Sequence, residues 1–200
     1  KAGPLKEADG KPLKGRRALE SRTLIECFPG AFEEDPVRIL RAVRFAAQLA
    51  FTLAPSVAPL ISRALAQLPR VSGERIRDEL MATFATDRAH DAIHTLNALG
   101  GLDAVFPELA EGRGMDQGNF HHLDVLGHQL ETLAQADRFL ADFAEFSEPL
   151  RGPMNAYCAE ELVERRSRKS LIKLGGLLHD VGKPANRQVQ GAVPSWPQEA

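Results

Sequence analysis

The sequence predicts an all-α fold, in which a succession of helices packs around shared apolar faces. Over most of the chain, apolar residues recur every three or four positions, which is the period of a helix with one buried side. No stretch of useful length alternates apolar and polar residues, so no strand is expected. Short segments of turn-forming residues separate the helical stretches, as they do in packed helical arrays.

Composition narrows the class of protein. The 200 residues fit one large domain or two small ones, and 44% hydrophobic residues are enough to build a core. No apolar run approaches the roughly 18 residues of a membrane span, so no membrane partner is expected. The net charge of −2 gives no general basic excess, so any nucleic-acid site must come from local clustering. Two cysteines are too few for a disulfide scaffold, and we expect a cytoplasmic protein.

The first long helix is predicted over residues 35–50. Asp35 suits the N-cap, and Pro36 suits the first helical position, where its missing N–H costs nothing. The apolar face carries Ile39, Leu40, Val43, Ala46, Ala47 and Ala50, and the opposite face carries Val37, Arg38, Arg41, Arg44 and Gln48. This pattern predicts an amphipathic helix whose polar side is rich in arginine.

The other segments are assigned in chain order. Residues 1–17 have no hydrophobic period and many turn residues, which predicts a loop. Further helices are predicted over residues 54–68, 72–86, 88–100, 122–146, 161–168 and 169–182. Ser72 is the expected N-cap of the helix that it begins. The Gly-rich segment 106–119 predicts a break between subdomains, and the chain after Pro184 is predicted to be a loop.

The polar side of the first long helix suggests a binding site. Asp35, Arg38, Arg41 and Arg44 recur every three residues. A carboxylate accepts hydrogen bonds and a guanidinium donates them, so Asp35 and Arg38 together match the amino donor and ring-nitrogen acceptor of cytosine and adenine. Uracil and guanine present the reverse order, and the remaining arginines can hold phosphates. The alternative is that Asp35 only caps the helix, with the arginines solvated or paired with the preceding glutamates.

Four segments resemble a known family. EEDPVRILRAVRFAAQLAF (residues 33–51) resembles the neck-helix motif of class II CCA-adding enzymes and bacterial poly(A) polymerases, and VSGERIRDEL (residues 71–80) resembles a second neck element. HHLDVLGHQLETL and LLHDVGKPA resemble the HD-type domain that follows the neck in some members. The resemblance implies a multi-helix neck/body array followed by an incomplete helical HD-like domain.

The resemblance also implies domain boundaries. Residues 1–24 correspond to a loop or linker at the trailing edge of a missing head domain, residues 25–117 to a helical neck/body that binds RNA and nucleotide, and residues 118–200 to the HD-like part. The family's head carries a Gly-Ser loop and an Asp-x-Asp pair that binds Mg²⁺, and this sequence contains neither pattern. We therefore expect a fragment of a template-independent RNA nucleotidyltransferase, with no catalytic residue in this chain and no activity alone.

The resemblance assigns roles to the polar side chains of the first long helix. Glu34, Asp35 and Arg38 match the family's nucleotide-reading EDxxR motif, in which Asp35 and Arg38 hydrogen-bond the base of CTP or ATP and Glu34 helps to orient them. Arg41 completes the predicted nucleotide-binding set. The expected partners are therefore RNA, at the 3′ end of tRNA, and CTP or ATP.

A second candidate site is a metal centre. His128, His179 and Asp180 match, by resemblance, the metal ligands of HD-type phosphohydrolases, and imidazole and carboxylate suit a divalent metal. No Asp or His follows Asp180, so the predicted ligand set is incomplete. The alternative is that the three side chains pair with one another at a helix end.

Two further patterns and two rival functions stay open. His90 and His94 lie four residues apart, a spacing that can bind metal, but no third ligand is visible. Residues 165–169 contain four cations, which form either a solvated helix end or a contact to RNA phosphates. The rival functions are an HD-type metal-dependent phosphohydrolase and a non-catalytic RNA- or nucleotide-binding module.

Overall fold

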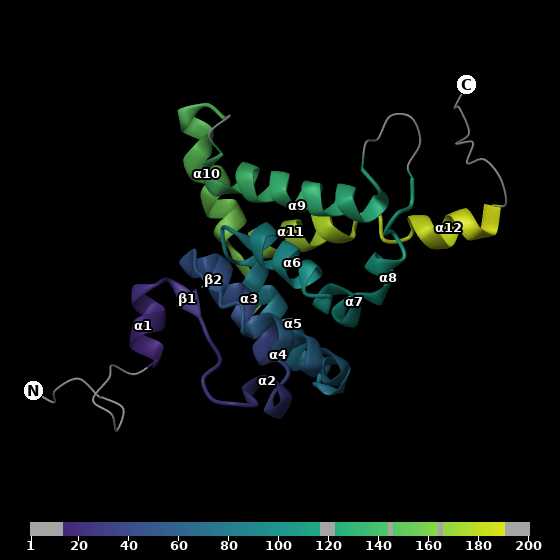
Figure 1. Cartoon of the computed structure of the whole chain (residues 1–200). Coiled ribbons are helices and arrows are strands. Elements are labelled where there is room, and N and C mark those ends of the chain that lie inside the picture. The colour runs from purple at the N-terminus through teal and green to yellow at the C-terminus, as the bar shows by residue number, and fades with distance from the viewer. Residues whose placement is uncertain (1–13, 117–122, 144–145, 164–165, 191–200) are drawn as a thin grey trace, which may run out of the picture.

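The computed structural model describes residues 14–116, 123–143, 146–163 and 166–190. Helices make up most of these residues, which confirms the predicted all-α fold (Figure 1). The helices are α1 (Lys14–Glu20), α2 (Ala31–Glu34), α3 (Arg38–Leu49), α4 (Val57–Ala64), α5 (Gly73–Phe84), α6 (Ala89–Ala98), α7 (Gly101–Val105), α8 (Pro107–Ala110), α9 (Val125–Asp142), α10 (Glu148–Ala159), α11 (Arg168–Leu178) and α12 (Lys183–Gln190), with a 3-10 helix η1 (Leu65–Arg70) after α4. Within the described ranges, no helix combines the length and the apolar character that crossing a membrane requires.

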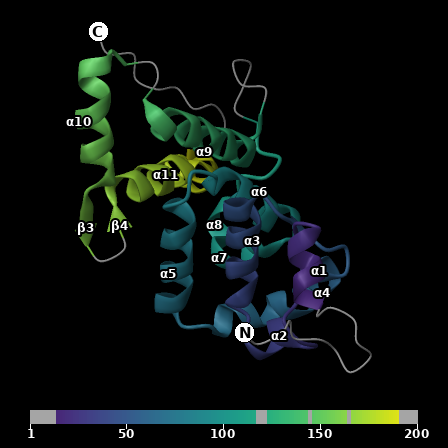
Figure 2. The same cartoon turned by 90° about the vertical axis from the view of Figure 1, so that its left-hand side faces the viewer.

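Helix α6 joins the first half of the chain to the second. α3 packs against α5 and α6, and α9 packs against α6 and α11. α11 also contacts α5, so the pair α9 and α11 lies at one end of the helices α3, α5 and α6 (Figure 2). This arrangement leaves the start of α3 and the start of α5 at the opposite end, away from α9.

One apolar core runs through both halves. Its members with less than 2% exposure include Ile39, Leu40, Ile61, Leu68, Phe84, Ile93, Leu96, Leu102, Leu109, Leu133 and Leu177. Each such side chain contributes about 1.5–3 kcal/mol relative to an exposed one. A smaller cluster of Leu140, Phe143 and Cys158 attaches α10 to α9. The main core contains residues from both sides of the predicted boundary between 117 and 118. The division of the chain at that point stays a prediction.

Helix α3 confirms most of the predicted amphipathic pattern. Five of the six residues expected on its apolar face are buried, but Ala50 is exposed because it ends the helix in the left-handed conformation, with φ 52°. The backbone N–H of Phe51 then donates to the carbonyl of Ala46 at 2.9 Å, which closes the helix end. Val37, expected on the polar face, is only 1% exposed, since it precedes the helix and faces the core.

Two pairs of short strands accompany the helices. β1 (Thr23–Leu24) runs parallel to β2 (Thr52–Leu53), and β3 (Glu161–Val163) pairs antiparallel with β4 (Arg166–Ser167). The helix predicted over residues 161–168 is therefore wrong. A hairpin forms there because Arg168 closes it: its backbone N–H donates to the Glu160 carbonyl at 3.1 Å and its guanidinium binds the Glu160 carboxylate at 2.9 Å.

Three predicted loops or breaks contain helix. α1 covers residues 14–20, where Arg16 and Glu20 form an ion pair one turn apart at 3.0 Å. α12 occupies the segment predicted as a loop after Pro184, because that proline is the second residue of the helix and its missing N–H is not needed there. The break at 106–119 contains α8. Residues 1–13 and 191–200, also predicted as loops, lie outside the described residues.

Candidate nucleotide-recognition site

The first candidate site lies where α2 ends and α3 begins. Asp35 sits between the two helices in extended backbone, with φ −143° and ψ 92°. The helix begins at Arg38 rather than at Pro36, and its N-cap is Val37, with no side-chain capping hydrogen bond. The prediction that Asp35 is the N-cap is therefore wrong, because an extra turn, closed by a hydrogen bond from the Arg38 N–H to the Asp35 carbonyl at 3.0 Å, precedes the helix.

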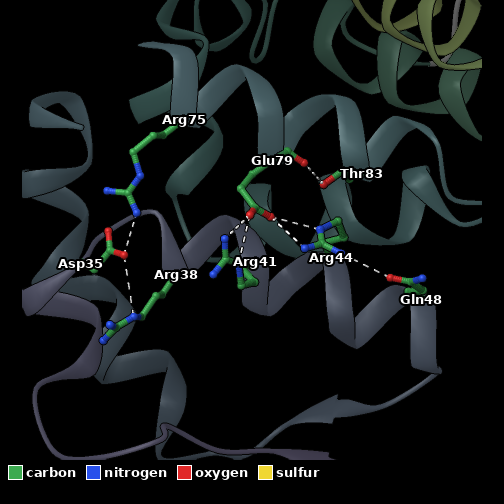
Figure 3. Close-up of polar contacts among 8 residues, drawn as sticks. All are labelled: Asp35, Arg38, Arg41, Arg44, Gln48, Arg75, Glu79 and Thr83. Carbon is green, nitrogen blue, oxygen red and sulfur yellow. Dashed lines mark hydrogen bonds and ion pairs between the residues drawn. The ribbon is translucent and has the colours of Figure 1, made fainter. Parts of the chain in front are cut away.

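The Asp35 carboxylate faces α5 (Figure 3). A guanidinium nitrogen of Arg75, Nη2, donates to Oδ2 of Asp35 at 2.8 Å, and Nε of Arg38 lies 3.8 Å from the same oxygen. The hydrogen bond from Arg75 is the main cause that lowers the pKa of Asp35 below its ordinary value, and the charge of Arg38 acts in the same direction. The Asp35 side chain is therefore an ionised acceptor at neutral pH.

Arg38 is oriented from several sides. Its Nη1 donates to the carbonyl of Ala31 at 3.0 Å and to Oε2 of Glu34 at 3.2 Å, and its guanidinium carbon lies 5.2 Å from the centre of the Phe28 ring. Its other terminal nitrogen, Nη2, makes no hydrogen bond to the residues that the structure describes. Asp35 and Arg38 thus lie side by side, and Glu34 contacts Arg38.

Arg41 belongs to a different contact. Glu79 of α5 accepts hydrogen bonds from Arg41 on Oε1 and from Arg44 on Oε2, at distances from 2.5 to 3.1 Å (Figure 3). The Glu79 side chain is only 12% exposed, so its ion pairs with Arg41 and Arg44 form a largely buried polar contact between α3 and α5. Arg41, predicted to bind nucleotide, is therefore held by Glu79 in this structure, although its side chain remains 47% exposed.

Arg75 and Glu79 are the polar residues that the sequence predictions missed. Their spacing of four places both on one helix face, where the local expectation is a pair within the helix. The structure instead directs Arg75 to Asp35 and Glu79 to the arginines of α3. The long sequence separation, 40 residues for Arg75 and Asp35, left no local signal for these contacts.

The second candidate site brings its three predicted residues together. Nε2 of His179 lies 3.3 Å from Nε2 of His128 and 3.1 Å from Oδ2 of Asp180. One ligand atom from each of the three residues lies within 4.8 Å of the others. Nδ1 of His179 lies 2.8 Å from the carbonyl of Gly176, which can only accept; this contact favours the neutral tautomer with its proton on Nδ1, in which Nε2 is the atom available to a ligand. Nζ of Lys183 also binds Oδ2 of Asp180, at 2.6 Å.

The residues of the two weaker predicted patterns mostly contact one another or other side chains of the protein. The rings of His90 and His94 lie 5.6 Å apart, and among the described residues no third ligand atom joins them. In the basic cluster, Arg168 pairs with Glu160 and Lys169 with Asp87, which favours the interpretation of this segment as a solvated, ion-paired surface. Residue 165 lies outside the described residues.

Comparisons with known proteins agree with the fold. Residues 50–112 match the family described as "Probable RNA and SrmB-binding site of polymerase A". The chain is 37% identical, over 178 residues, to the A-adding tRNA nucleotidyltransferase of Deinococcus radiodurans, with 86% of this chain and 35% of that protein covered. It is 32% identical, over 174 residues, to the CC-adding tRNA nucleotidyltransferase of Geobacter sulfurreducens, with 87% and 37% covered.

A solved structure supports the same assignment at the level of fold. A tRNA nucleotidyltransferase complexed with a primer tRNA and an incoming ATP analog has a TM-score of 0.52 and 21% identity, and the match covers 90% of this chain and 50% of that one. Together the fold and the sequence matches define a helical region of a protein of the nucleotidyltransferase class. The chain belongs to the family of class II CCA-adding enzymes and bacterial poly(A) polymerases, in its neck and body region. It spans about a third of the length of the two curated relatives.

Proposed function

We propose that this chain is part of a template-independent RNA nucleotidyltransferase that adds nucleotides from CTP or ATP to the 3′ end of tRNA. Within that protein, residues 25–117 supply base recognition and RNA binding, residues 1–24 form the trailing edge of the head, and residues 118–200 form the HD-like part. The head, outside this chain, supplies the catalytic carboxylates and Mg²⁺. The two thiols, Cys27 and Cys158, are both free, which supports the reducing cytoplasm as its compartment.

The observation that carries this proposal is the paired acceptor and donor at the start of α3. Asp35 offers a carboxylate oxygen to the exocyclic amino group of cytosine or adenine. Nη2 of Arg38 donates to the neighbouring ring nitrogen, N3 of cytosine or N1 of adenine. Uracil and guanine place a carbonyl against Asp35 and an N–H against Arg38, so both groups lose their partners. Such a mismatch costs about 1.5–3 kcal/mol when one partner is charged.

The side chains around this pair support the same role. Glu34 and the Ala31 carbonyl hold Nη1 of Arg38, which leaves Nη2 directed elsewhere. Arg41, whose side chain is 47% exposed, contacts a phosphate while its guanidinium stays bound to Glu79. The relatives named as A-adding and CC-adding enzymes support both ATP and CTP as substrates of the longer protein.

The purified 200-residue chain is expected to bind tRNA without transferring nucleotides to it. Transfer requires the metal-binding Asp-x-Asp pair, which the sequence of this chain does not contain. Incubation with labelled CTP or ATP and tRNA should leave the RNA unlabelled, while the full-length protein should label its 3′ end. Labelling by the isolated chain would overturn the assignment of catalysis to the head, and an unlabelled product from the full-length protein would overturn the proposed function.

The arrangement of His128, His179 and Asp180 supports a second, metal-linked candidate, the HD-type phosphohydrolase. Two imidazoles and a carboxylate fit a divalent metal in donor type, and the proton on Nδ1 of His179 directs Nε2 towards it. The fit is partial, because the Lys183 ammonium occupies the Asp180 oxygen that a metal needs. If a metal is bound, these residues would hold it and it would supply an activated water for phosphoester hydrolysis.

Metal binding by this chain is expected to be weak. After dialysis, elemental analysis should find less than one Zn²⁺ or Mn²⁺ per chain, since only three ligands come together among the described residues and Lys183 opposes binding. Lys183→Met should tighten Mn²⁺ binding in calorimetric titrations, and His179→Ala should abolish it. A stoichiometric metal that survives dialysis of the unmodified chain would contradict this and would show that a further group completes the site.

A further inference from the structure

The orientation of the Asp35 side chain is not set by its own segment of the chain alone. Asp35 lies outside α2 and α3, in extended backbone, and the residue that caps α3 is Val37. A short carboxylate in such a junction can rotate between several staggered positions. The backbone N–H of Val37 and the charge of Arg38 act on it locally, but its strongest contact comes from another element.

That element is α5. Arg75 lies in its first turn, and its Nη2 donates to Oδ2 of Asp35 at 2.8 Å, across 40 residues of sequence. α5 itself is firmly placed, because Leu80 and Phe84 are buried in the core and Glu79 binds two arginines of α3. Arg75 thus extends from a fixed helix to the one acidic group of the base-reading pair (Figure 3).

We infer that Arg75 is a positioning and specificity-determining residue, which holds the Asp35 carboxylate so that one oxygen is presented to the amino group of cytosine or adenine. This inference rests on the proposed function and adds to it a residue of α5. Arg75 occupies Oδ2, so the other oxygen, Oδ1, is the one we assign to the base. Arg75 need not touch the nucleotide; it acts through Asp35.

Exposure distinguishes this role from a contribution to folding. The Arg75 side chain is 52% exposed and that of Asp35 is 21% exposed. Ion pairs of this kind contribute little to stability, because water screens them and two side chains lose freedom. Fixing the position of a hydrogen-bonding group, in contrast, affects selection strongly, since small displacements weaken a directional bond. Loss of Arg75 should therefore change nucleotide choice much more than it changes thermal stability.

A double-mutant cycle in the full-length protein tests the inference. The measured quantity is the ratio of kcat/KM for CTP or ATP to kcat/KM for UTP or GTP, in the unmodified protein, Arg75→Met, Asp35→Asn and the double variant. Arg75→Met should lower this ratio by about tenfold, and should have no further effect in the Asp35→Asn background. Arg75→Lys, which keeps a donor without the planar fork, should recover part of the loss.

Arg77→Met is the matched control. Arg77 lies on the same helix and is similarly exposed, but it binds Asp78 at 2.9 Å and not Asp35. This variant should keep the nucleotide ratio within about twofold. Circular dichroism should show equal melting temperatures for both methionine variants.

Each outcome separates the inference from the function on which it rests. If Asp35→Asn loses discrimination while Arg75→Met and Arg75→Lys keep it, the inference fails and the proposed function stands. If Asp35→Asn keeps discrimination, the proposed base-reading role is wrong, and the inference that rests on it is wrong as well. If Arg75→Met lowers the ratio equally in both Asp35 backgrounds, Arg75 acts by a route other than Asp35, and the inference is again wrong.

Discussion

Replacing Asp137 by Ala is expected to lower the free energy of unfolding of this chain by about 3–5 kcal/mol, because it leaves a buried ammonium without its counter-ion. Lys173 of α11 is 0% exposed, and its Nζ binds Oδ1 of Asp137 at 2.6 Å and the carbonyl of Thr86 at 2.5 Å. Oδ2 of Asp137 accepts from the backbone N–H of His90 at 2.7 Å. The pair therefore joins α9, α11 and the start of α6. Urea unfolding followed by circular dichroism measures the effect.

An exposed ion pair nearby provides the control for that prediction. Asp87 binds Lys169 at 2.5 Å, but its side chain is 70% exposed, so Asp87→Ala should cost less than about 1 kcal/mol. In the Asp137→Ala background, Lys173→Met should recover part of the lost stability, because it removes the unpaired charge. Equal effects of Asp137→Ala and Asp87→Ala would contradict the assignment of a buried, obligatory pair.

The second large effect is expected at the base-reading pair. In the full-length protein, Asp35→Ala should reduce discrimination for CTP and ATP over UTP and GTP by about tenfold to a hundredfold, which corresponds to about 1.5–3 kcal/mol for a lost hydrogen bond to a charged group. The measurement is kcat/KM for each of the four nucleotides on a tRNA acceptor. Loss of transfer with all four nucleotides in equal proportion would contradict a role in base choice.

The same substitution should change stability only slightly. A lost helix cap would cost about 1 kcal/mol, but the N-cap of α3 is Val37 and not Asp35. What is lost is the exposed pair with Arg75, for which we expect less than about 1 kcal/mol. Since this pair lowers the folded-state pKa of Asp35, its contribution is complete above the unfolded pKa and is lost as the pH falls through the lower, folded pKa.

The sequence predicted well what depends on local periodicity. Most of the apolar face of α3, including Ile39 and Val43, is buried as expected, because a three- and four-residue spacing leaves few other arrangements. The α5 boundary at Ser72 and Gly73 was also predicted correctly from residue preferences at helix starts. The juxtaposition of Asp35 and Arg38 follows from their spacing of three along the chain.

The sequence could not predict contacts that depend on how separate helices pack. The partners of Arg75 and Glu79 lie 35 to 40 residues away, and only the placement of α5 beside α3 brings them together. The run of charged residues at 161–168 led to a wrong prediction. The sequence there resembles a helix, but the strands pair as a hairpin that Arg168 and Glu160 close. In that segment, one pair of residues eight positions apart outweighs the local preference for a helix.

Whether the carboxylate of Asp35 reads the nucleotide base is decided by a single variant, Asp35→Asn in the full-length protein. Asn has nearly the same size, so the junction between α2 and α3 should keep its shape, but the side chain loses its charge and presents an amide that can donate. We expect the preference for CTP and ATP over UTP and GTP, measured as a ratio of kcat/KM values, to fall by at least about tenfold. An unchanged ratio with unchanged efficiency would show that the carboxylate is not used to read the base, and would contradict the proposed role of the α2–α3 junction in nucleotide selection.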